Sequence, residues 1–267
     1  MSMDIYHQIE GLDGFAAKAR EVSQVKGTSM PERIDSIAAA YKAVVDLLNM
    51  PRQENVIMAV REGDARKATE AMTELATWSG LNTGIVAPAE NVAISACMDE
   101  WGAVVMGNHN AIVHEFNRHA TALGNVKKAG NIFLGNDSTE LVSRLEQGGE
   151  DQFKAVVEQR TACKQLTRLA RLMILNMSLG TIVPITLPAQ ITSPEGRSMM
   201  LAETCFDTAK LNEDDANDFA IMWRRATHDG DIHDEQWAQL ANLGFIPSAR
   251  KWDKLWEDSQ KNKTTKQ

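Results

Sequence analysis

Four basic side chains recur along residues 153–179, and they are the strongest candidates for chemistry in this sequence. Arg160, Lys164, Arg168 and Arg171 follow one another at intervals of three or four residues, which on a helix places them within about 80° of each other. The opposite side of that helix is apolar and carries Ala162, Leu166, Leu169 and Met173. We call the four cations the basic stripe. They would span about 16 Å and could bind consecutive phosphates, and the alternative is an ordinary solvated helix face.

A cluster of histidines at positions 109, 114 and 119, with Glu115 among them, is the second candidate. Zinc sites on helices use two histidines four residues apart. The histidines here are five apart, so successive ones rotate by about 140° and do not converge. We therefore expect surface or interface histidines and no metal site.

Residues 228–237 (HDGDIHDEQW) have the Asp-Gly core of a calcium-binding loop. With Gly230 as the sixth loop position, the first and twelfth positions are Arg225 and Gln236, where calcium needs carboxylates. A tight turn between helices with acidic caps is favoured, and cation binding at this turn is left open. The sequence predicts neither a metal nor a cofactor.

Catalytic motifs are absent from the sequence. It contains no nucleophile elbow and no glycine-rich phosphate loop, so we expect a protein that is not an enzyme.

The cysteines are three in number and far apart, which predicts free thiols in a reducing, cytoplasmic compartment. The start of the chain lacks the features of a signal peptide. Residues 172–194 carry no charge, but polar residues and prolines interrupt them, so we expect no membrane span.

Charge is distributed unevenly along this acidic chain, whose net charge is −8. Residues 153–175 carry a charge of +4, whereas residues 201–235 carry −7. The basic stripe could therefore pair with the acidic segment, within one chain or between two chains, or it could bind a polyanion.

Helical periodicity dominates the sequence, and an alternating strand pattern is almost absent. We predict an all-α fold of roughly nine or ten helices. The expected helix breaks lie at Gly63-Asp64, at Gly80 with a loop over 81–87 before Pro88, at Gly124, at Gly148-Gly149 and near Gly180.

These breaks suggest a domain organisation. We expect an N-terminal arm over residues 1–30, a single helical domain over 31–258 and a polar tail over 259–267, with flexible ends. The glycine-rich loop at 124–136 could divide the domain into two helical lobes around a basic groove. In that arrangement Lys127 and Lys128 would join the basic stripe.

Residues 160–209 resemble the central part of the coat proteins of flexible filamentous plant viruses, and related helical folds occur in some nucleoproteins of negative-strand RNA viruses. The resemblance is carried by Lys164-Gln165 with Arg168, by two later prolines, and by the segment 201–207 (LAETCFD) that ends in Phe206-Asp207. It implies a groove that holds single-stranded RNA, and subunits that polymerise through terminal arms. It also implies a buried pair between the family's arginine position, Lys164 here, and an acidic residue, for which Asp207 is the candidate.

Two functions follow. The first is a self-assembling protein that coats single-stranded RNA without sequence specificity, in the host cytoplasm or the virion. Its phosphate contacts would come from the basic stripe, Lys127, Lys128 and Arg197. The second is a cytosolic helical adaptor or assembly factor that binds proteins and no nucleic acid. The acidic segment 201–235 and the tryptophans near the C-terminus favour this alternative.

Overall fold

The chain folds as an assembly of helices in a computed structural model that describes residues 11–48, 52–134, 138–180, 194–207, 211–228 and 231–257. The predicted all-α class is confirmed. The helices are α1 (Gly11–Val22), α2 (Glu32–Leu48), α3 (Arg52–Arg61), α4 (Ala65–Lys128), α5 (Ser138–Leu179), α6 (Pro194–Cys205), α7 (Glu213–Ala226) and α8 (Asp234–Asn242). Residues 252–257 are also helical. The strands β1 (Thr227–His228) and β2 (Asp231–Ile232) form one short antiparallel ribbon.

The longest element is α4, whose 64 residues correspond to about 96 Å of helix. Asp64 caps its N-terminus by accepting hydrogen bonds from the backbone N–H groups of Arg66 and Lys67. The predicted breaks at Gly80, at 81–87, before Pro88 and at Gly124 are wrong, because the helix continues through all of them. Packing of α2 and α3 along the N-terminal part of α4 supplies stabilisation that outweighs the weak helix-forming tendency of Gly80 and Pro88. Gly124 is buried in the body, near Ile246.

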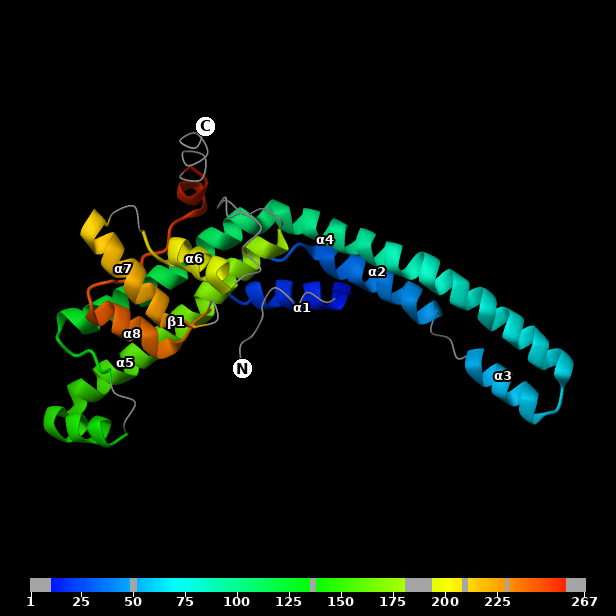
Figure 1. Cartoon of the computed structure of the whole chain (residues 1–267), viewed down its shortest axis with the longest axis horizontal. Helices are drawn as coiled ribbons and strands as arrows, with labels where there is room; N and C mark the ends of the chain where they lie inside the picture. The colour runs from blue at the N-terminus through cyan, green and yellow to red at the C-terminus, as the bar shows by residue number, and fades with distance from the viewer. Residues whose placement is uncertain are drawn as a thin grey trace.

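The molecule has a helical body and a long projection (Figure 1). In the body, α5 packs along α4, α6 and α8 pack against α5, and α7 packs against α8. The N-terminal part of α4 runs out of the body with α2 and then α3 alongside it. We call α3 and the facing start of α4, residues 52–77, the projecting hairpin. Its end is the farthest point of the molecule from α7 and α8.

The C-terminal half of α5 forms the centre of the hydrophobic core. Residues 172–177 are buried without interruption, so α5 is enclosed on all sides there. Two polar groups in this region satisfy each other, since the Trp101 indole N–H donates to the backbone and side-chain oxygens of Asn176 at 3.1 Å. The Asn176 amide in turn donates to the carbonyl of Val105 at 2.9 Å. This network fixes the register of α5 against α4.

Residues 11–22 belong to the core and not to an arm. Leu12, Phe15, Ala19 and Val22 of α1 are buried, because their spacing places them on one helix face. Glu90 of α4 accepts a hydrogen bond from the Leu12 backbone N–H at 3.2 Å, at the positive end of α1. The expected arm over residues 1–30 is therefore corrected for residues 11–22, and residues 1–10 lie outside the described residues, as do the tail residues 259–267.

The loop expected at 124–136 is shorter than the sequence suggests. α4 extends to Lys128, and Gly130, with φ +72°, ends the turn that follows. The elements on both sides of this loop, α4 and α5, contribute to one hydrophobic core. Among the described residues the loop therefore marks a reversal of the chain between two packed helices and no division into lobes.

A run of polar residues on α4 holds extended segments of the chain in place. The Asn117 amide pairs with both backbone groups of Ala249, at 2.9 and 2.8 Å. Asn108 does the same with Ser29, at 2.8 and 2.9 Å, and Asn110 accepts from the Trp252 backbone N–H at 2.9 Å. These side chains replace secondary-structure hydrogen bonds for segments that would otherwise bury unpaired backbone groups.

The cysteines are free, as the sequence predicts, and all three are buried. Burial raises the pKa of the Cys163 thiol to about 12 and raises that of Cys205 further. Neither group is a reactive thiolate at neutral pH.

Among the described helices, none combines the length and the apolar character that crossing a bilayer requires. Residues 181–193 of the uncharged run lie outside the described residues.

Candidate nucleic-acid interface

The basic stripe lies on the part of α5 that follows a kink at Gly149. This glycine has φ 64° and ψ −151°, a conformation that is accessible to glycine and strained for other residues. The expected break at Gly148-Gly149 is therefore present as a change of direction within α5. Beyond it the helix is amphipathic, and the predicted apolar stripe is confirmed as core, since Ala162, Leu166, Leu169 and Met173 are all buried.

Three of the four stripe cations are accessible. Arg160, Lys164 and Arg168 are exposed, and none of them forms an ion pair with another residue that the structure describes. They follow the surface of α5 over eight residues, which is about 12 Å. They thus form a line of unneutralised positive charge over a rigid, well-packed helix.

Arg171 differs from the other three because it is held by the body of the protein. Its guanidinium donates to both carboxylate oxygens of Asp231 in β2, at 2.6 and 3.3 Å. The two side chains are 33% and 16% exposed. The sequence left open whether the stripe pairs with the acidic segment 201–235, and at Arg171 it does. This bidentate pair fastens the two-stranded ribbon to α5 and removes Arg171 from the line of free cations.

Two apolar residues extend the line of free cations towards the kink. The sequence interpretation placed Phe153 apart from the basic stripe and did not consider Val157. Phe153 and Val157 are 53% and 46% exposed, and helical spacing places them within about 60° of Arg160 and Lys164. The sequence does carry a signal for them, because each lies seven and eleven residues before two of the cations, a spacing that returns to the same face of a helix. An exposed aromatic ring beside unpaired cations is an arrangement that can stack on a base.

The loop after α4 is clamped beside the start of this line. The Gln159 side chain accepts from the backbone N–H of Phe133 at 2.8 Å and donates to its carbonyl at 2.6 Å. Both residues are buried. The clamp keeps the loop against α5 directly before Arg160.

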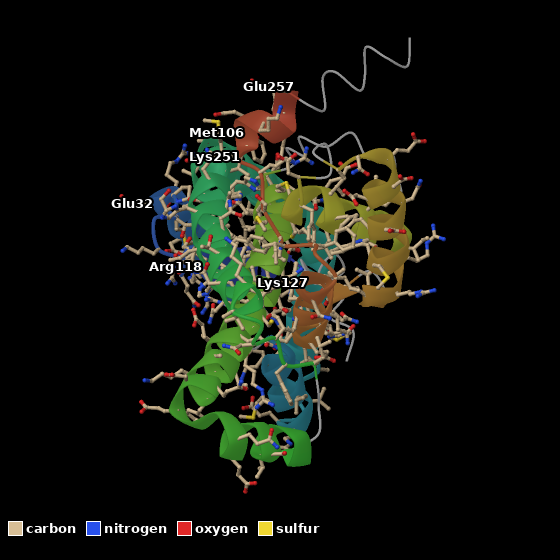
Figure 2. The ribbon with its side chains drawn as sticks, turned by 90° about the vertical axis from the view of Figure 1, so that its left-hand side faces the viewer. Glu32, Met106, Arg118, Lys127, Lys251 and Glu257 are labelled. Atoms are coloured by element: carbon tan, nitrogen blue, oxygen red, sulfur yellow. The ribbon has the colours of Figure 1, made fainter. Side chains whose placement is uncertain are left out.

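Lys127 and Lys128 occupy the last turn of α4. Lys128 is exposed and Lys127 is partly buried, with its ammonium close to Gly244 in the turn after α8. Figure 2 shows Lys127 at the end of α4 beside α8. The position of both lysines at a helix C-terminus is electrostatically favourable for α4 whether or not they bind a ligand.

The remaining two predicted site residues lie on α6. Arg197 is in the first turn of α6, and its side chain lies outside those described. Asp207 is partly buried just after the end of the helix. Lys164 is exposed, so it is not the buried basic member of the pair that the resemblance implies.

Acidic groups also lie near the stripe. Asp234 and Glu235, at the start of α8, raise the pKa of the Cys163 thiol through their charges, after the larger effect of burial. They therefore lie close to α5 at the position before Lys164. Their negative charge opposes anion binding on this side of α5.

The histidine cluster does not converge. His114 is exposed and His119 is partly buried, and Glu115 pairs with Arg118 and lies 3.6 Å from His119. His109 is fully buried, which corrects its expected place on the surface. The described residues include no group of three or more ligating side chains that could hold a metal ion.

At the acidic turn 228–237, residues 229 and 230 lie outside the described part of the chain.

Comparison with protein-family models, with curated proteins and with solved structures finds no match to this chain.

Proposed function

We propose that this chain is a self-assembling, non-catalytic protein that coats single-stranded RNA, in the manner of a viral coat protein or nucleoprotein, in the cytoplasm of a host or in a virion. The observation that supports this most strongly is the line of exposed, unpaired cations Arg160, Lys164 and Arg168. Cations on a rigid helix attract phosphates and release counterions without regard to base sequence. The protein's net charge of −8 means that its surface as a whole does not attract a polyanion, so binding depends on local positive charge such as this line.

Phe153 and Val157 give the same face a second component. A base can stack on the exposed ring while its phosphate meets Arg160, and this stacking is sequence-tolerant because every base has a π-face. Lys128 and Arg197 supply further positive charge in this proposal. Arg171 acts indirectly, because its pair with Asp231 holds the ribbon against α5.

The decisive experiment measures binding of a fluorescent 20-nucleotide oligo(U) by anisotropy over a series of salt concentrations. A variant with Arg160→Gln, Lys164→Gln and Arg168→Gln should bind at least about tenfold more weakly at low salt. The slope of log affinity against log salt should fall by about 2, since each cation on a single strand contributes about 0.7. Phe153→Ala should weaken binding and leave the slope unchanged.

The matched control removes three exposed cations elsewhere, with Lys42→Gln, Arg224→Gln and Arg225→Gln. This control changes the net charge by the same amount as the first variant and should retain most of the wild-type affinity for oligo(U). Neutralising Asp234 and Glu235 should strengthen binding. If the wild-type protein, purified free of nucleic acid, ignores the oligonucleotide at low salt, the RNA-coating proposal is refuted.

The alternative function, a protein–protein adaptor, is favoured by a different observation. An open groove of about 430 Å³ lies between α7 and the turn after α8, and it combines apolar and acidic side chains. Such a groove suits an amphipathic helix of a partner. An adaptor would form a defined complex with a second protein and would show no salt-dependent binding to oligo(U).

A further inference from the structure

We propose that the projecting hairpin of one copy docks into the groove between α7 and α8 of a second copy, which would join the chains head to tail. This inference rests on the self-assembly part of the proposed function and is independent of RNA binding. Its evidence lies in two apolar surfaces that the chain itself leaves uncovered.

The first surface is the projecting hairpin. Among the side chains described between residues 52 and 77, Ala59 is the only one that is buried. Ile57, Met58 and Val60 of α3 are 53%, 53% and 64% exposed, although they belong to five consecutive apolar residues. Helices of this length gain most of their stability from packing, and a cluster of large exposed apolar side chains marks an interaction site.

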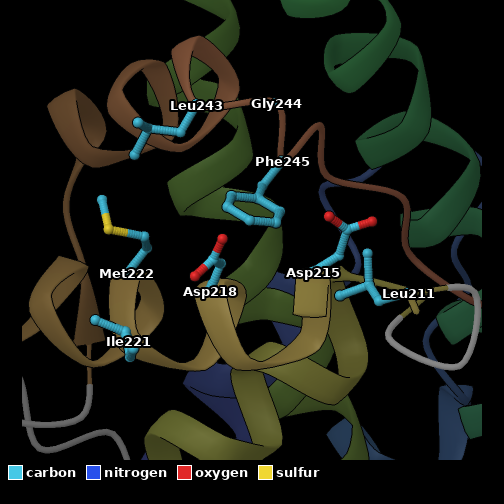
Figure 3. Close-up of a pocket in the computed structure, with 8 residues that line it drawn as sticks. All are labelled: Leu211, Asp215, Asp218, Ile221, Met222, Leu243, Gly244 and Phe245. Carbon is cyan, nitrogen blue, oxygen red and sulfur yellow. The ribbon is translucent and has the colours of Figure 1, made fainter. Parts of the chain in front are cut away.

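The second surface is the groove between α7 and the turn after α8. Asp215 and Asp218 lie along it, and its apolar lining comes from Leu211, Ile221, Met222, Leu243 and Phe245. Figure 3 shows both carboxylates beside the Phe245 ring, with Ile221 and Leu243 towards the opposite end. Ile221 and Leu243 are 52% and 50% exposed. The groove is therefore apolar with an acidic side.

Charge matches the two surfaces. On α3, Ile57, Val60 and Arg61 fall within about 100° of one another, so the apolar face carries a cation. Arg61 forms no ion pair with another described residue, and neither does Asp218 in the groove. Docking the apolar face of α3 in the groove would bring these two unpaired charges to the same interface, where opposite charges set orientation.

The geometry selects a second copy as the occupant. The projecting hairpin and the groove lie at opposite ends of the molecule (Figure 1), so the hairpin cannot fill the groove of its own chain. An interface between two unlike surfaces is heterologous, and repeating it produces an open chain of subunits unless the rotation closes a ring. Such a chain would be a filament built without a contribution from RNA.

The test uses two variants that each lose one surface. Ile57→Asp with Val60→Asp removes the hairpin surface, and Ile221→Lys with Leu243→Lys removes the groove surface. All four residues are exposed, so circular dichroism and the melting temperature should match the wild type. Mass is measured by light scattering on protein free of nucleic acid. The control is Met106→Asp, at an exposed apolar residue of α4 outside both surfaces (Figure 2).

The expected result is that wild type and the Met106→Asp control rise more than about twofold in average mass with concentration, whereas each surface variant alone stays at 29.5 kDa. An equimolar mixture of the two variants should form a dimer and stop there, because only one intact interface exists per pair. Likewise, Arg61→Glu should weaken association, and mixing it with Asp218→Arg should restore it.

Three results would overturn the inference. Association of the groove variant as strong as that of the wild type would show that the groove is not needed for association. A mixture that remains monomeric, while both variants are folded, would show that the two surfaces do not meet. A wild type that stays monomeric with and without RNA would remove self-assembly altogether. If the wild-type protein associates but does not bind oligo(U), RNA coating is refuted and this inference stands.

Discussion

His109 illustrates how one buried side chain couples stability to pH. Its Nε2–H donates to the carbonyl of Arg250 at 3.1 Å, its ring meets Trp252 edge to face, and its Nδ1 has no hydrogen-bond partner among the described residues. Burial lowers the pKa of His109 from 6.5 to about 4. The ring is therefore neutral in the folded protein at pH 7.

The depressed pKa predicts that the fold weakens with acid. Between about pH 6.5 and 4 the unfolded chain binds a proton at His109 that the folded chain does not, so the free energy of unfolding falls as the pH falls through this window. The contribution at pH 5 is about 2 kcal/mol. His109→Gln keeps a donor for Arg250 and should lose this part of the pH dependence.

Urea unfolding of both proteins at pH 7 and pH 5 measures the effect. The difference in unfolding free energy between the two pH values should be about 2 kcal/mol larger for wild type than for His109→Gln. An equal difference in the two proteins would show that His109 is protonated in the folded state.

Asn176 carries a second prediction at the same scale, because its amide N–H donates to the Val105 carbonyl and an ionised carboxylate has no hydrogen to donate. Asn176→Asp places a carboxylate against the carbonyl of Val105 in a fully buried site. We expect a loss of about 3 kcal/mol or more in unfolding free energy at pH 7. Asn176→Leu removes this donor and also the side-chain acceptor of the Trp101 indole N–H, but it buries no charge and should cost less. Denaturant unfolding of the two variants checks the order, and a reversed order would contradict the prediction.

The elements show which part of the structure was accessible from the sequence. The break at Gly63-Asp64, the end of α5 near Gly180 and the buried face of α5 follow from local chemistry, and they agree with the structure. The continuity of α4 does not follow from local chemistry, since Gly80 and Pro88 lie inside it. It depends on α2 and α3 packing alongside, which is a tertiary effect. The pair between Arg171 and Asp231 was hidden for the same reason, because 60 residues separate its members.

Pro88 supplies the prediction at this scale. A proline inside a helix lacks a donor N–H and crowds the preceding turn, which disfavours the helix by about 3 kcal/mol relative to alanine. Pro88 is exposed, so Pro88→Ala should remove this penalty without opening a cavity. We expect an increase of about 1–3 kcal/mol in stability, measured by thermal and urea unfolding. Val92→Ala, at an exposed site one turn later, is the control and should gain at most about 0.7 kcal/mol from helix propensity. A less stable Pro88→Ala would contradict the argument.

On the scale of the whole molecule, the unequal distribution of burial separates a stable body from a projection. Residues 172–177 of α5 are buried on every side, whereas residues 52–77 contain one buried side chain among those described. Segments with few buried contacts open with free energies far below that of global unfolding. The two regions should therefore differ in hydrogen exchange by several orders of magnitude, although both are helical.

Hydrogen exchange followed by mass spectrometry tests this difference at two protein concentrations. In dilute protein, peptides from 52–77 should exchange within seconds to minutes, and peptides from 172–177 should resist exchange for hours or longer. At a concentration where chains associate, protection should rise in 52–77 and in 211–222, and the groove variant Ile221→Lys with Leu243→Lys should abolish the rise in both. Protection of 52–77 in the dilute monomer equal to that of α5 would contradict the prediction, because it would mean that the hairpin is stable without a partner.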